Sequence, residues 1–176
     1  MTITKNCLAA LLSVAAITAH AGGDEGFSAG LSVQPRASAA DIGLPLYPGA
    51  VRERERRDGV EDGDSDSASI SLWGGPFGMD LHVMKLRSGD SVEVVSRFYR
   101  DAMQRQGRLV DCSRDAPPEP AATASDGKLM RCGSDRAKPG AFLFKLALPG
   151  GVRMVAIEPA PGGSRIQLVR LMLRGD

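Results

Sequence analysis

One amphipathic helix stands among segments that alternate like β-strands, and this contrast limits the possible fold more than any other feature. Between Asp90 and Gly107, apolar side chains recur at three- and four-residue steps and fill an arc of about 140° on a helix. Asp90 and Glu93 have the spacing of a capping box, and Gly107 has the place of a C-terminal glycine cap. We expect Phe98 and Tyr99 to mark the centre of the core. The apolar positions are Val92, Val95, Phe98, Tyr99, Ala102 and Met103.

The other side of this helix is rich in arginine, which could hold an anion or an acidic partner. Glu93, Arg97, Asp101 and Arg105 follow one another at four-residue steps, so these charges partly satisfy one another. We therefore favour a solvated face over an anion site. The residues on this face are Glu93, Arg97, Arg100, Asp101, Arg105 and Arg108.

The segments around the helix predict strands. A hairpin is expected from residues 67–73 and 79–87, short strands from 109–112 and 128–132, and a three-stranded meander from 141–148, 152–158 and 164–173. Short turns rich in Gly and Pro join antiparallel neighbours. The sequence therefore predicts an α+β fold, with one main helix over about 90–106 on an antiparallel sheet of roughly five to seven strands that ends in the meander.

Residues 51–57 also predict a strand, in which basic and mostly acidic side chains alternate. Arg52, Arg54 and Arg56 would share one face and could bind phosphate. An exposed edge strand guarded by charge explains the same pattern, because charged side chains block edge-to-edge pairing. We favour the edge strand.

The first 21 residues predict a signal peptide. Lys5 precedes an apolar run over residues 8–19, and Ala19-His20-Ala21 has the A-x-A pattern of a cleavage site between Ala21 and Gly22. The run is shorter than the roughly 20 apolar residues that a bilayer requires. No other segment comes closer, so we expect no integral membrane segment and a periplasmic or secreted mature protein.

After this segment we expect a flexible leader over residues 22–40 and a single domain over 41–176. The leader is rich in Gly, Ala and Ser, a composition that buries too little apolar surface to offset its ordering entropy. Without Lys5, basic and acidic residues are equal in number. This balance argues against a nucleic-acid partner, whose recognition depends on excess positive charge.

Two cysteines, Cys112 and Cys132, remain after the predicted cleavage. An isolated pair in an oxidising compartment is most simply a disulfide. The redox alternative would need a C-x-x-C motif, which the spacing does not provide. We expect a structural bridge that clamps the base of a proline-containing loop.

The acidic turn over residues 61–66 resembles the start of a calcium-binding loop, with Asp62, Asp64 and Asp66 at alternating positions. Ser67 and Trp73 stand where that motif requires glycine and glutamate. A solvated hairpin loop is the favoured interpretation, and a calcium-dependent module is the alternative.

Catalysis has little support in the sequence. His82 is the only histidine of the mature chain, and Asp80 shares its strand face, so a small hydrolase using both is the rival hypothesis. The sequence contains no G-x-S-x-G elbow. It also offers no zinc-ligand set, Walker loop or haem motif, and we expect no cofactor.

The segment from Leu44 to Ala50 (LPLYPGA), followed by a hairpin and a helix carrying Phe98-Tyr99, resembles a set of exported bacterial proteins of uncharacterised function. The resemblance covers roughly residues 44–173 and implies the fold and export, but no catalytic residues. We therefore expect a non-enzymatic binding or structural module that contacts an unknown protein or envelope partner. Its oligomeric state is open at this point.

Overall fold

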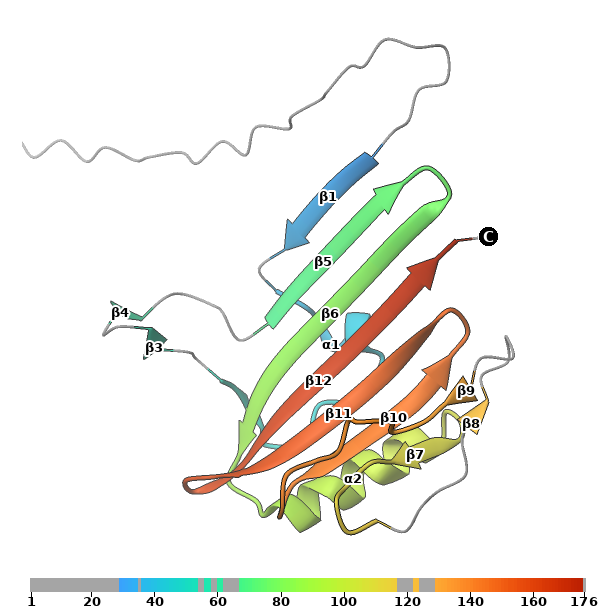
Figure 1. The fold of residues 1–176 in the computed structure, drawn as a ribbon. Coiled ribbons are helices and arrows are strands. Elements are labelled where there is room, and N and C mark those ends of the chain that lie inside the picture. Colours follow the sequence, from blue (N-terminus) through green and yellow to red (C-terminus); the bar gives the residue numbers. More distant parts are fainter. Residues whose placement is uncertain are drawn as a thin grey trace, which may run out of the picture.

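The computed structural model describes residues 29–34, 36–53, 56–57, 60–61, 67–116, 122–123 and 129–175. Its main feature is one open antiparallel sheet of eight strands with two helices packed on one face (Figure 1). The sheet strands are β1 (Ala29–Gln34), β2 (Val51–Arg52), β5 (Ser67–Gly74), β6 (Phe77–Ser88), β7 (Leu109–Asp111), β10 (Phe142–Leu148), β11 (Gly151–Ala160) and β12 (Gly163–Arg174). The helices are α1 (Ala39–Ile42) and α2 (Val92–Gln104). Two separate two-stranded sheets are β3 (Arg56–Arg57) with β4 (Val60–Glu61), and β8 (Ala122–Thr123) with β9 (Leu129–Met130).

The strands follow the order β1-β5-β6-β12-β11-β10-β7, and β2 pairs with the end of β6. All these pairs are antiparallel, which confirms the expected hairpin (β5 and β6) and the expected meander (β10 to β12). The α+β class is confirmed with eight strands, where roughly five to seven were expected. No helix in the described part of the chain is long and apolar enough to cross a bilayer.

The sheet strand that the sequence did not predict, β1, comes from the N-terminal part of the chain. β1 and the first two residues of α1 lie within residues 22–40, the segment for which we expected a flexible leader. β1 forms because it pairs along its whole length with β5, placing Leu31 opposite Leu72 and Val33 opposite Ile70. The composition of residues 29–34 does not predict this strand, because the strand forms by pairing with a segment that is distant in the sequence.

The expected strand over residues 51–57 is also divided. Val51 and Arg52 form β2 on the sheet, whereas Arg56 and Arg57 belong to the separate β3–β4 pair. β2 pairs only with β6, so Val51 and Arg52 lie at an edge of the sheet, beyond the end of β5. Arg52 donates to the Ser67 hydroxyl at 2.7 Å, which engages its guanidinium inside the fold.

The core lies between α2 and the lower part of the sheet (Figure 1). Tyr99 is fully buried at its centre, and its hydroxyl accepts a hydrogen bond from the Tyr47 amide at 3.2 Å. Burial raises the pKa of Tyr99 to about 12. Phe98 is only partly buried and packs edge-on between Tyr47 and Tyr99. The helix stripe is thus confirmed, but Tyr99, and not Phe98, is its innermost aromatic residue.

The ends of α2 differ from the expected capping pattern. Ser91 is the N-cap residue, and Asp90 instead accepts a hydrogen bond from the Tyr47 hydroxyl at 2.5 Å. At the other end Arg105 is the C-cap in right-handed geometry, and Gly107 does not adopt positive φ. The capping box and the glycine cap are therefore both wrong. At the first end, the contact of Asp90 with Tyr47, 43 residues away in the chain, is one that local spacing does not reveal.

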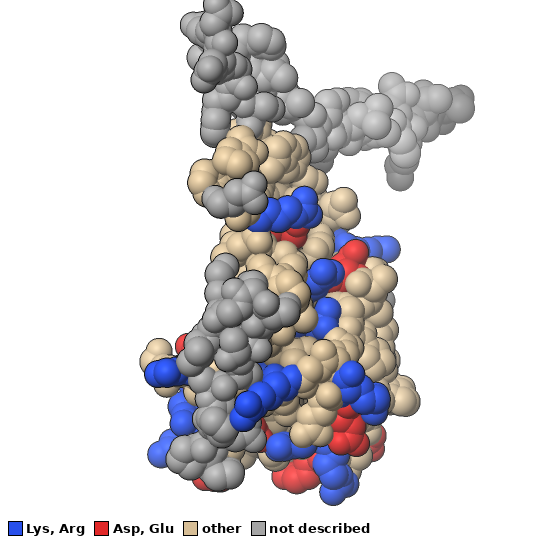
Figure 2. All heavy atoms as spheres, turned by 90° about the vertical axis from the view of Figure 1, so that its right-hand side faces the viewer, with Lys and Arg blue, Asp and Glu red and all other residues tan. Residues whose placement is uncertain are grey.

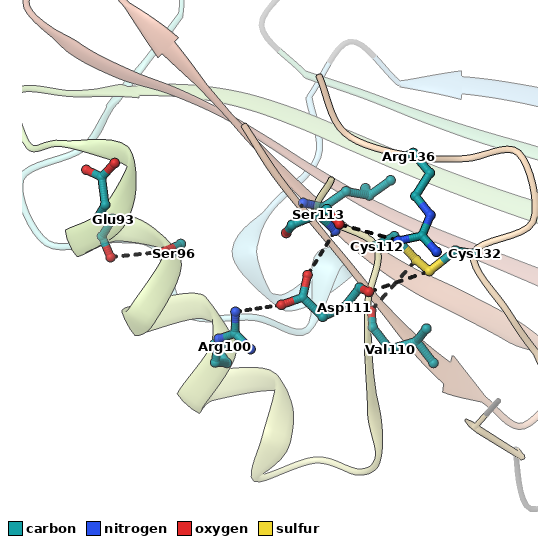
Figure 3. A network of polar contacts seen from close by, with 10 residues as sticks. Glu93, Ser96, Arg100, Val110, Asp111, Cys112, Ser113, Cys132 and Arg136 are labelled. Carbon is teal, nitrogen blue, oxygen red and sulfur yellow. Dashed lines mark hydrogen bonds and ion pairs between the residues drawn. A yellow bond between two sulfur atoms is a disulfide. The ribbon is translucent and has the colours of Figure 1, made fainter. Parts of the chain in front are cut away.

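A polar network ties α2 to β7, and a disulfide joins the residue after β7 to the segment after β9 (Figure 3). Cys112 and Cys132 are bonded, with their Cα atoms 5.4 Å apart. Asp111 accepts from the Arg100 guanidinium at 2.6 Å and from the Ser113 amide at 2.9 Å. Arg100 also lies 4.9 Å above the ring of a core phenylalanine, so it belongs partly to the core side and not to the solvated face.

Two arginines of the sheet hold α1 in place. Arg153 donates from Nε to the Ile42 carbonyl at 2.7 Å, and Arg170 donates to the Asp41 carbonyl at 3.0 Å. Cations are favourable at a helix C-terminus, where carbonyl groups lack partners. Arg153 is buried, and this burial lowers its pKa. These bonds fix α1 on the same face as α2.

Candidate functional site

The two faces of the sheet are covered very differently. On β5, the serines point toward the helices: Ser67 and Ser69 are buried, with Ser69 only 7% exposed, and Ser71 is partly buried. The apolar residues of the same strand point away from the helices, and Leu72 is 47% exposed. The alternation in the sequence correctly grouped these residues by face. It would ordinarily indicate the opposite orientation, with the apolar row inside.

The face without helices carries an apolar patch arranged in three rows across the strands. The first row is Leu31, Leu72, Met79 and Leu173; the second is Val33, Ile70, Leu81, Leu171 and Val152; the third is Ala68, Val83, Val169 and Met154. None of these positions is charged. We call these thirteen residues the apolar patch.

The patch has a clear boundary at its lower end. The next row contains Lys85 and Gln167, and the row after it contains Arg87, Arg165 and Glu158. Strand and residue spacings give the patch a footprint of roughly 20 Å by 20 Å, or about 400 Å². In the side view of Figure 2, most of the visible charged side chains lie in the lower half of the molecule. An apolar patch of this size on a monomer is often functional.

One part of this face is covered by the chain itself. Val110 and Leu143 pack against Met130 and Cys132, which belong to the disulfide-clamped segment. Lys145, on the same face, donates to Asp135 at 2.6 Å, and this lysine lowers the pKa of the Asp135 carboxyl. The disulfide segment therefore covers the β7–β10 side, and the described residues leave the patch uncovered from β1 to β11.

A hollow of about 490 Å³ adjoins the first row of the patch. Its lining includes Leu72, Phe77, Met79 and Leu173, with Trp73 and Arg174 at the margin. Phe77 is 65% exposed, an unusually large exposed fraction for an aromatic side chain. The volume lies in the range of sites that accept a small ligand or an anchoring side chain. The patch and the hollow form one continuous apolar region.

The covered face contains the residues of the hydrolase hypothesis. The Ser69 hydroxyl lies 2.7 Å from Nδ1 of His82, but Ser69 is buried. Asp80 is bound by the Arg174 guanidinium. A catalytic triad needs an acid that orients the histidine and a serine that substrate can reach. The structure brings Ser69 and His82 together but does not join Asp80 to them, so it offers no such relay.

Several expected sites fall outside the described residues. These are the cleavage site at Ala21 and Gly22, the acidic positions Asp62, Asp64 and Asp66, and Arg54 of the basic tripod. In the part of the chain that is described, no three ligating side chains gather in a group that could hold a metal ion.

No family model, curated sequence or solved structure matches this chain. The surface itself is therefore the basis for a functional proposal. The sequence could not show that the apolar residues of β5 lie on the open face, because alternation alone does not say which side of a strand the helices cover.

Proposed function

We propose that the protein is an exported, non-enzymatic module that binds a partner protein through the apolar patch. The observation that carries this proposal is the uncharged surface of thirteen side chains on the face without helices. Export is supported by the apolar run and A-x-A pattern at the N-terminus, and by a disulfide, which persists in an oxidising compartment such as the periplasm.

The size of the patch limits the kind of binding. Covering about 400 Å² of apolar surface contributes about 10 kcal/mol. Association opposes this with a cost of about 4–15 kcal/mol. The patch alone therefore supports weak association, and we expect the partner to add an apolar side chain that enters the hollow beside Phe77. Binding energy in interfaces is concentrated in such anchors.

Site-specific photo-crosslinking in the native envelope tests the proposal. A photoreactive residue at Leu81, in the middle row of the patch, should give a crosslink to one partner protein. The same residue at Gln167 is the matched control, because it lies on the same face of β12 beyond the apolar rows and is exposed. Equal crosslinking at the two positions, or none at Leu81, would contradict a binding role for the patch.

The variant His82→Ala separates this function from the hydrolase alternative. His82 lies on the opposite face from the patch, where it contacts Ser69. The crosslink from Leu81 should therefore persist in this variant. Loss of a hydrolytic turnover in the variant, with no effect on any partner, would favour the enzyme.

A further inference from the structure

The two edges of the sheet are protected in different ways. At one edge, β7 has only three residues, and the chain beyond it is held by the disulfide and by a hydrogen bond from Ala137 to the Cys112 carbonyl at 3.1 Å. At the other edge, β1 has six residues and pairs on one side with β5. Nothing in the described part of the chain pairs with its other side.

The residues of β1 lack the devices that usually prevent edge pairing. Natural edge strands carry charged residues, prolines or bulges, because an unpaired row of amides and carbonyls is a template for another strand. Residues 29–34 (AGLSVQ) contain no charge and no proline. Leu31 and Val33 are 65% and 62% exposed on the patch side. The strand therefore presents a free backbone edge beside free apolar side chains.

The order of residues in β1 makes it complementary to itself. In an antiparallel pair of two β1 strands centred on Ser32, Leu31 lies opposite Val33 of the other copy. Gly30 lies opposite Gln34, and Ser32 opposite its own equivalent. Apolar side chains thus meet apolar side chains on one face, and small or polar ones meet on the other. A two-fold axis creates this arrangement automatically, since both copies contribute the same surface.

We propose that two copies of this chain associate through their β1 strands, antiparallel, to form one sheet that continues across the two-fold axis. The first two rows of the apolar patch then run from one copy into the other through Leu31 and Val33. The contact uses the edge of the sheet, so it does not depend on a partner protein covering the patch.

Disulfide trapping with Ser32→Cys tests the proposal, in a Cys7→Ser background so that the new thiol is alone. Residues directly opposite in an antiparallel pair have Cα atoms about 4.5–5.5 Å apart, which suits a disulfide. With copper phenanthroline as oxidant, we expect this variant to run as a dimer on a non-reducing gel. Ser71→Cys is the matched control. Ser71 pairs with Ser32 on the next strand and faces the same side, but its equivalent lies three strand spacings away, about 14 Å.

A monomeric Ser32→Cys variant, or equal crosslinking of both variants, would overturn the proposal. A mixed disulfide between Ser32→Cys and a different protein, without a dimer, would overturn it also, because the edge would then serve another partner.

Sedimentation equilibrium provides a second test without any crosslink. The unmodified chain should sediment as a dimer, and Ser32→Lys should shift it to a monomer with at least a tenfold weaker association, because like charges would meet at the axis. Ser71→Lys should remain dimeric, and circular dichroism should show both variants folded. A dimeric Ser32→Lys variant would refute the pairing. Retention of the Leu81 crosslink in Ser32→Lys would show that the proposed function stands independently.

Discussion

Replacing Tyr99 with alanine is expected to lower the free energy of unfolding by about 3–5 kcal/mol, the usual cost of deleting a buried aromatic side chain. Tyr99 is fully buried between α2 and the sheet, and its hydroxyl accepts the hydrogen bond of the Tyr47 amide. Alanine would leave a cavity and an unpaired amide. Urea unfolding followed by circular dichroism measures the effect.

Phe98→Ala is the matched control for this prediction. Phe98 neighbours Tyr99 on α2 but is only partly buried at the margin of the core. We expect a smaller loss of about 1–3 kcal/mol, because less apolar surface returns to water. Tyr99→Phe should lose about 1 kcal/mol, the typical net contribution of one hydrogen bond. A larger loss for Phe98→Ala than for Tyr99→Ala would place the centre of the core on the other side of the helix.

Removing the disulfide with the double variant Cys112→Ala and Cys132→Ala is expected to lower the free energy of unfolding by about 3 kcal/mol. The bond closes a segment with a sequence separation of 20, and the chain-entropy relation gives this magnitude for a loop of that length. The small cluster of Val110, Met130 and Leu143 should loosen as well, since the disulfide holds Met130 over the sheet.

Reduction of the unmodified protein is the control for the double variant. A reducing agent should destabilise the unmodified protein by a similar amount and leave the variant unchanged. Thiol titration of the denatured, unreduced mature chain should find no free thiol. A stability change near zero in the variant would mean that the clamp adds nothing to the fold.

The elements that local sequence determines could be predicted. The helix stripe was recognisable because Val95, Tyr99 and Met103 recur at helical spacing, and all three are fully buried. The β5–β6 hairpin and the β10–β12 meander were recognisable because Gly and Pro turns separate alternating segments. The cysteine pair was identified by elimination, since the mature chain offers no other partner.

The elements that depend on distant contacts could not be predicted. β1 is a Gly- and Ser-containing segment that becomes a strand only because β5 lies beside it. Asp90 looks like a helix cap, but the Tyr47 hydroxyl, 43 residues away in the chain, binds its carboxylate. The face of the sheet on which the apolar residues of β5 lie could not be predicted either. Alternation shows that Ile70 and Leu72 share a face, but only the position of the helices shows that this face stays open.

The central claim is that a partner covers the apolar patch in the native envelope, and thiol labelling of Leu72→Cys tests it most directly. Leu72 lies in the first row of the patch and is exposed, whereas Ser69 on the same strand faces the helices and is buried. In the purified protein, Leu72→Cys should react rapidly with a maleimide and Ser69→Cys slowly. In the intact envelope, we predict at least tenfold slower labelling of Leu72→Cys, with Ser69→Cys slow in both preparations. Equally rapid labelling of Leu72→Cys in the two preparations would contradict the account.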